Sequence, residues 1–179
     1  MVIAYHSIFT TYGTWLPNDP RGSFSKAVYN EELAALGPVL YGRQSPQPRP
    51  AAMLRFHTMA CSRLARAPFF IDEGTRLLVT AGFREAIKRL GIVVHECAIM
   101  NNHVHLLVQR STYRIEYVVN QLKGAATRTL GLSETPWARN GWNVFLNNLE
   151  AVAAAAEYIR ANPPAAGLAP QRWDFLQPI

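Results

Sequence analysis

One segment, "IVVHECAIMNNHVHLLVQ", constrains the fold of this 179-residue chain more than any other. Its two halves, Ile92–Met100 and His103–Gln109, are rich in β-branched and apolar residues, which is typical of strands. The intervening Asn101-Asn102 pair tolerates the positive φ of a tight turn. The segment therefore predicts an antiparallel hairpin. Because side chains alternate across a strand, both histidines of its second strand share one face.

The rest of the chain alternates strand patterns with apolar residues at helical spacing. The predicted elements around the hairpin are a strand at Ile3–Thr11, a short helix at Asn30–Leu36, a helix from the N-cap Asp72 to Gly91, a helix at Arg114–Leu130, a strand at Gly141–Leu146, and a helix at Leu149–Asn162 capped by Asn147 or Asn148 and ended by Pro163-Pro164. This order predicts an α+β fold. It is the ferredoxin-like split βαβ pattern, an antiparallel sheet with helices packed on it and an additional C-terminal helix.

Length and composition predict a single folded domain over residues 1–179, with a flexible, proline-rich insertion near residues 37–51. Hydrophobic residues make up 49% and charged residues 17% of the chain, which excludes a disordered protein. The formal net charge of +6 suits a phosphate-rich partner. Two cysteines form neither a disulfide framework nor a thiolate zinc site, and no apolar run is long enough to span a bilayer. We therefore expect a soluble, cytoplasmic protein without a membrane partner.

The pair His103 and His105 on one strand face can hold a divalent ion, since histidine is a common metal ligand. Two isolated histidines at this spacing are more often ordinary polar residues on a half-exposed face. A catalytic ion also needs a third, preferably oxygen, ligand and open positions for substrate.

The segment "EYIRANP" offers that ligand and a nucleophile. Tyr158 and Asn162 are four residues apart and so share one helix face, with small alanines beside them. Alternatively, Asn162 only ends a helix before proline, and Tyr158 only packs its ring. Tyr117 and Gln121 form a competing pair at the same spacing on the middle helix.

Together, "MNNHVHLLV" and the later "EYIRANPPAAGL" resemble the motifs of the single-tyrosine HUH (IS200-like) transposases, in particular the REP-associated tyrosine transposases. In that family a histidine, a hydrophobic residue and a histidine precede a tyrosine that has an amide residue four positions later. "QLKGAATRTL" and "YHSIFTTYGTWLP" also resemble the family's middle helix and opening strand. The segment near residues 37–51 and "WARNGWNVFL" depart from the pattern.

The resemblance implies a metal-dependent enzyme that cleaves and rejoins single-stranded DNA at hairpin-containing sites. Tyr158 would be the nucleophile that forms a 5′-phosphotyrosine, and His103, His105 and Asn162 would hold Mg²⁺ or Mn²⁺. The alternative is a domesticated protein that binds a DNA or RNA hairpin without cutting it. Family members act as monomers or homodimers, and both remain open.

Binding of single-stranded DNA requires cations for phosphates and rings for unpaired bases. The candidates, each equally compatible with an ordinary solvated surface, are Trp15, Arg21, Arg114, Lys123, Arg128 and Arg139.

Overall fold

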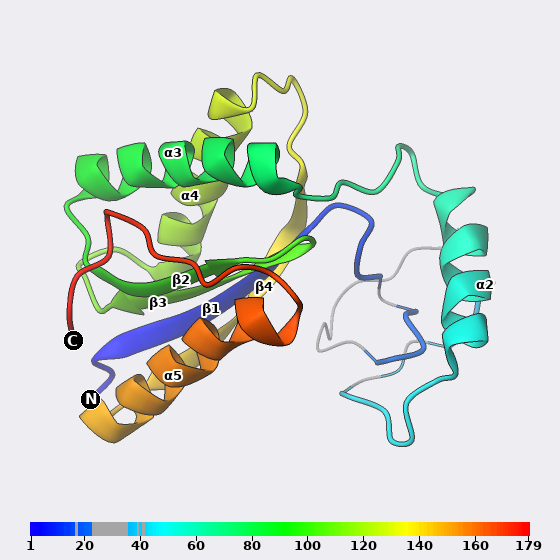
Figure 1. The fold of residues 1–179 in the computed structure, drawn as a ribbon, viewed down its shortest axis with the longest axis horizontal. Helices are drawn as coiled ribbons and strands as arrows, with labels where there is room; N and C mark the ends of the chain where they lie inside the picture. Colours follow the sequence, from blue (N-terminus) through cyan, green and yellow to red (C-terminus); the bar gives the residue numbers. More distant parts are fainter. Residues whose placement is uncertain (17, 23–35, 39, 41) are drawn as a thin grey trace. The chain divides into compact units, whose positions relative to one another are not determined.

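The computed structural model describes residues 1–16, 18–22, 36–38, 40 and 42–179 (Figure 1). The chain divides into two compact units, one formed by Met1–Thr10 with Phe70–Ile179 and the other by Thr11–Phe69. Most of the predicted helix at Asn30–Leu36 lies outside the described residues. A single domain over residues 1–179 with an insertion near residues 37–51 stays a prediction.

A four-stranded sheet with the strand order β2-β3-β1-β4 forms the centre of the first unit. Its strands are β1 (Ala4–Thr11), β2 (Val94–Ile99), β3 (His103–Gln109) and β4 (Trp137–Leu146). Strand β3 pairs antiparallel with both β2 and β1, so the hairpin predicted from the sequence is confirmed. Strand β4 begins four residues earlier than predicted.

Helices cover both faces of this sheet (Figure 1). Helices α3 (Glu73–Leu90) and α4 (Ile115–Thr129) lie on one face, and α5 (Leu149–Ala165) lies on the other. The α3/α4 side contains an aromatic cluster in which the rings of Phe9, Phe83 and Trp137 contact one another. The α5 side is built from smaller side chains, among them Ala4, Ala98, Leu107, Ala156 and Ile159. The predicted α+β architecture is confirmed.

The helix ends largely follow the capping residues of the sequence. The Asp72 carboxylate accepts a hydrogen bond from the Thr75 amide, and Gly91 ends α3 with a φ of 62°. Asn148 caps α5 in the same way through the Ala151 amide. The predicted stop at Pro163-Pro164 is wrong, because both prolines lie inside the last turn of α5. The fixed φ of proline is compatible with a helix, and each proline removes one amide donor from this last turn.

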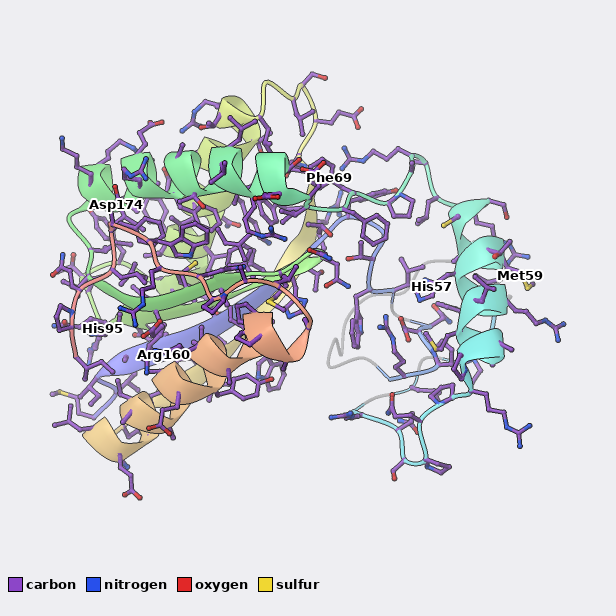
Figure 2. The ribbon with its side chains drawn as sticks, viewed as in Figure 1. His57, Met59, Phe69, His95, Arg160 and Asp174 are labelled. Atoms are coloured by element: carbon purple, nitrogen blue, oxygen red, sulfur yellow. The ribbon has the colours of Figure 1, made fainter. Side chains whose placement is uncertain are left out.

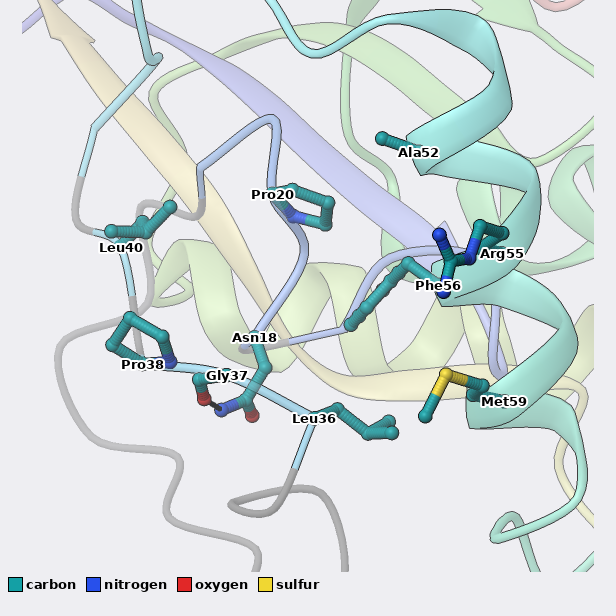
Figure 3. Close-up of a pocket in the computed structure, with 10 residues that line it drawn as sticks. All are labelled: Asn18, Pro20, Leu36, Gly37, Pro38, Leu40, Ala52, Arg55, Phe56 and Met59. Atoms are coloured by element: carbon teal, nitrogen blue, oxygen red, sulfur yellow. Dashed lines mark hydrogen bonds between the residues drawn. The ribbon is translucent and has the colours of Figure 1, made fainter.

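The second unit contains α2 (Pro50–Cys61), a helix that the sequence analysis did not predict. Phe56 and Ala60 are its buried residues, and they pack against Leu16. Between this helix and the preceding loops lies a pocket of about 310 Å³, lined mainly by apolar side chains such as Leu36 and Met59 (Figure 3). None of the predicted site residues lines this pocket.

The C-terminal tail runs along the outer edge of β2. Leu176 forms a bridge with Val94, and the indole nitrogen of Trp173 donates to the Cys97 carbonyl. The tail thus supplies hydrogen-bond partners to an edge strand that would otherwise present unpaired backbone groups. Among the helices that the structure describes, none has the length and apolar character needed to cross a membrane.

Helices α3 and α4 approach each other closely at Gly82. A Cβ atom at this position would lie 2.7 Å from the Cα of Ala126, whereas a Cβ at Gly74 of the same helix would meet nothing closer than 3.8 Å. We expect Gly82→Ala to destabilise the protein by about 1–3 kcal/mol through overpacking, and Gly74→Ala to stabilise it by about 0.5–1 kcal/mol through helix propensity. Urea unfolding of both variants checks this, and equal effects would contradict the proposed close approach.

Candidate active site

The side chains of His103 and His105 lie on the sheet face that α5 covers. Their Nε2 atoms are 3.0 Å apart, and their rings meet edge to face. His105 is buried, with 3% of its surface exposed, while His103 is half-buried. The Nδ1 atom of His103 lies 2.7 Å from the Oδ1 atom of Asn102, which fixes the orientation of that ring. Both imidazoles thus turn the same nitrogen atom toward a common point.

A third histidine, His6 on β1, belongs to this cluster and was not predicted from the sequence. Its Nε2 atom lies 3.0 Å from the Nδ1 atom of His105, and only 7% of its surface is exposed. The pairing of Ile8 with His105 places even-numbered residues of β1 on the histidine face of β3. The alternation within β1 was visible in the sequence, but its pairing partner lies about a hundred residues further along the chain.

Burial keeps these imidazoles neutral. Desolvation lowers the pKa of His103 to about 4, and desolvation together with the neighbouring histidines lowers the pKa of His105 to about 3. Burial also lowers the pKa of His6. Neutral imidazole is the form that binds metal ions, so at pH 7 the cluster needs no deprotonation before it can act as a ligand.

Helix α5 brings Tyr158 onto the histidines. The centroid of its ring lies 5.5 Å from that of His105 and 5.9 Å from that of His6, yet 55% of the tyrosine remains exposed. Asn162, one turn later, donates from Nδ2 to the Tyr158 carbonyl at 2.7 Å. The amide oxygen of Asn162 is therefore the atom that could bind an ion. Tyr158 is exposed, unlike the buried His105, and is therefore accessible to a large substrate.

Small side chains allow α5 to lie close to the sheet. Ala156 is buried in the contact, and Ala151 and Ala155 pack at its margin, whereas Ala154 is exposed. The helix is also tied to β2, because Nε of Arg160 donates to the Glu96 carboxylate at 3.1 Å (Arg160 is labelled in Figure 2). The Glu96 carboxylate is used in this ion pair.

The histidines supply only part of the ligand set that a hard divalent cation requires. Among the residues that the structure describes, no three His, Cys, Asp or Glu side chains are grouped to hold a metal ion. The 3.0 Å between the two Nε2 atoms nevertheless matches adjacent ligands of an octahedral ion, which are ~3 Å apart when each bond is ~2.1 Å. His103 and His105 could therefore hold a cation, with the Asn162 oxygen as the candidate third ligand.

The competing pair on α4 has other contacts. The Tyr117 ring stacks on that of Tyr113, with centroids 5.4 Å apart, and the side-chain oxygen of Gln121 accepts a hydrogen bond from Arg89. Helix α4 also packs on the opposite face of the sheet from the histidines (Figure 1). The geometry therefore brings Tyr158, rather than Tyr117, to the histidine pair.

Two of the six candidate DNA contacts depart from expectation. Lys123 is buried, and its ammonium donates to the Ala138 carbonyl at 2.8 Å, so it lies in the interior rather than on a DNA-binding surface. Burial lowers the pKa of Lys123 to about 8. Arg21 donates to both carboxylate oxygens of Asp19 and lies over the Trp15 ring, 3.9 Å from its centroid. The exposed candidates are Trp15, Arg114, Arg128 and Arg139.

The low pKa values of the histidines predict acid-sensitive stability. Unfolded histidine binds a proton near pH 6.5, whereas folded His103 does so only near pH 4, so the unfolding free energy should fall as the pH drops from 6.5 toward 4. His103→Gln removes one group that binds a proton in the unfolded chain. The slope of the unfolding free energy against pH should therefore decrease between pH 6.5 and 5 by up to ~1.4 kcal/mol per pH unit. Urea unfolding at several pH values measures this slope. Identical slopes for the variant and the wild type would show that His103 is not held neutral.

The chain is similar to known transposases in sequence and in fold. A family model described as "Transposase IS200 like" matches residues 51–148, which is more than half of the chain and includes both β3 histidines. No curated protein matches. A solved structure of a REP-associated tyrosine transposase bound to a REP hairpin is 10% identical, with a TM-score of 0.52, and the match covers 92% of this chain and 68% of that one.

A protein from Deinococcus radiodurans that carries a transposase assignment is 14% identical, with a TM-score of 0.39, and the match covers 90% of this chain and 91% of that one. The similarity to the REP-associated tyrosine transposase shows that the fold is shared. The family match covers β3, the strand that carries the two imidazoles. The resemblance noted in the sequence is thereby confirmed, and the chain belongs to the IS200-like transposase family.

Proposed function

We propose that this transposase cleaves and rejoins single-stranded DNA through Tyr158, with a divalent cation held by His103, His105 and Asn162. The observation that carries the proposal is the contact of the exposed Tyr158 ring with the buried His105 ring. A phenol placed at the rim of a pair of neutral imidazoles combines a nucleophile with metal ligands, and a phosphodiester can reach it from solvent.

The protein fold positions both the nucleophile and the proposed metal ligands. The sheet fixes the two imidazoles, and α5 carries both Tyr158 and the Asn162 amide, so the nucleophile and the third ligand move as one body. Mg²⁺ or Mn²⁺ bound there would neutralise charge on the scissile phosphate. The buried histidines cannot do this themselves at pH 7, because their lowered pKa values leave them uncharged.

The reaction exchanges one phosphodiester for another. The Tyr158 oxygen bonds to phosphorus as the bond from phosphorus to the 3′ oxygen breaks, which leaves a 5′-phosphotyrosine and a 3′-hydroxyl. The phenolic proton is lost and the departing oxygen gains one. Attack by a second 3′-hydroxyl reverses the step and joins two strands, and no nucleotide cofactor is consumed because the ester bond is conserved.

A hairpin in single-stranded DNA is the proposed substrate. The similar structure that binds a REP hairpin supports this class of ligand, and the net charge of +6 suits it. The exposed Arg114, Arg128 and Arg139 are the proposed phosphate contacts, and Trp15 is a ring on which a base could stack.

We expect Tyr158→Phe to abolish a covalent protein–DNA adduct. Wild-type protein is incubated with a labelled library of single-stranded hairpins and Mg²⁺ or Mn²⁺ and is then denatured in SDS. A shifted band should form, should be lost with EDTA, and should be lost in Tyr158→Phe because the attacking oxygen is absent. Tyr117→Phe is the matched control and should keep the adduct.

Other outcomes would contradict the proposal. Cleavage that survives Tyr158→Phe would indicate hydrolysis by water, and loss of the adduct in Tyr117→Phe alone would reassign the nucleophile. Tight hairpin binding without any adduct, in any divalent metal, would favour the non-cutting hairpin-binding protein.

Replacing the exposed arginines should weaken hairpin binding in a salt-dependent way. For each phosphate contact that is lost in Arg114→Gln, Arg128→Gln or Arg139→Gln, the slope of log affinity against log salt should fall in magnitude by ~0.7 for a contact to a single strand and ~0.9 for a contact to the duplex stem. Arg84→Gln is a control of equal charge, because Arg84 pairs with Asp174. Fluorescence anisotropy at several salt concentrations measures the slopes, and equal slopes in all four variants would remove these arginines from the interface.

A further inference from the structure

We propose that His6 is a positioning residue that controls the tautomer of His105: by accepting the His105 proton at Nδ1, it would free the Nε2 lone pair of His105 for the ion. This inference rests on the proposed function, because it takes His105 as a metal ligand. It assigns a role to a residue that lies outside both sequence motifs.

The geometry separates His6 from the ligands. Its Nε2 atom faces Nδ1 of His105, while the Nε2 atom of His105 faces His103. His6 is therefore hydrogen-bonded to the opposite nitrogen of the His105 ring from the one that faces the candidate ion site. Ligand imidazoles commonly donate their second N–H to such a partner, which fixes both tautomer and ring orientation.

The hydrogen bonds between the three imidazoles determine which nitrogen atom of each ring carries the proton. A neutral imidazole has one donor and one acceptor nitrogen, and the Asn102 oxygen can only accept. His103 therefore carries its proton on Nδ1, and its Nε2 atom bears a lone pair. Without an ion, the 3.0 Å contact between the two Nε2 atoms requires His105 to donate from Nε2, so His6 must donate from its own Nε2 to Nδ1 of His105.

A cation held by His103 and His105 would take up both Nε2 lone pairs, and the proton of His105 would then sit on Nδ1. It then donates to Nε2 of His6, whose own proton moves to Nδ1. His6 therefore has to act as a donor in one state and as an acceptor in the other. Histidine can do both without moving its ring. The amide of glutamine can also do both, but it has to flip.

Packing holds His6 in the position that this exchange requires. Its ring lies 5.2 Å from that of His105 and 5.9 Å from that of Tyr158, measured between centroids, and 7% of its surface is exposed. The backbone beneath it is fixed by the pairing of β1 with β3. A side chain that fills the same space without polar atoms would leave Nδ1 of His105 without an acceptor.

The first test measures Mn²⁺ affinity by electron paramagnetic resonance in the absence of DNA. We expect His6→Leu to weaken binding ~10–100-fold, the range for the loss of an outer-shell partner, and His6→Gln to stay within ~3-fold of wild type. His95→Leu removes an imidazole of β2 that contacts the carbonyl of Gln177 in the C-terminal tail, and it should not change the affinity. Equal affinities in His6→Leu and wild type would overturn the proposal.

The second test needs no variant, so a folding defect in His6→Leu cannot obscure it. Long-range ¹H–¹⁵N NMR correlations report which imidazole nitrogen carries the proton, and Mg²⁺ is diamagnetic. Saturating Mg²⁺ should move the proton of His105 from Nε2 to Nδ1 and that of His6 from Nε2 to Nδ1. A wild-type protein that binds Mg²⁺ and forms the DNA adduct while His6 keeps its Nε2 proton would overturn this inference alone. A wild type that neither binds an ion nor forms the adduct would overturn the proposed function with it.

Discussion

The antiparallel pairing of β1 with β3 is the constraint on which the site depends. It sets Ile8 opposite His105, and thereby places His6 and His105 side by side on the face that α5 covers. A shift of one residue in this register would turn His6 toward the aromatic cluster of Phe9, Phe83 and Trp137 on the other face. The same aromatic core therefore stabilises the sheet and holds the histidine face in register. Three adjacent imidazoles are held here as neutral groups that are hydrogen-bonded to one another, and the proposed change of tautomer would turn the Nε2 lone pairs of His103 and His105 to a cation.

Local patterns in the sequence were sufficient for the framework. The hairpin, the capped helix α3 and the shared face of His103 and His105 all arise from interactions between residues close in the chain. Tyr158 and Asn162 share a helix face for the same reason, and two motifs in the expected order identified the family. Their proximity to the histidines depended on the fold, which the order of strands and helices indicated correctly.

Features that depend on distant partners could not be predicted. His6 is one polar residue in a strand, and only the sheet order reveals that it bonds to His105. Lys123 resembles a surface lysine in its helix, but Phe9 and the carbonyl of Ala138 enclose its ammonium. Helix α2 follows a proline-rich stretch and has only two buried residues, so its apolar periodicity is weak. The two prolines predict a helix stop, yet α5 continues through them to Ala165, where only one residue of the helix follows the missing amide donors.

The compact unit Thr11–Phe69 lies, in sequence, between β1 and the rest of the sheet, and it accounts for more than half of the 99 residues that separate His6 from His105. Closing a chain loop costs entropy that grows only with the logarithm of its length, at ~0.6 kcal/mol for each doubling. Removing the whole unit would roughly halve the loop, so its presence costs the histidine contact little. Evolution can therefore lengthen, shorten or replace this unit at small thermodynamic expense to the histidine cluster, provided that the two ends still allow β1 to reach β3.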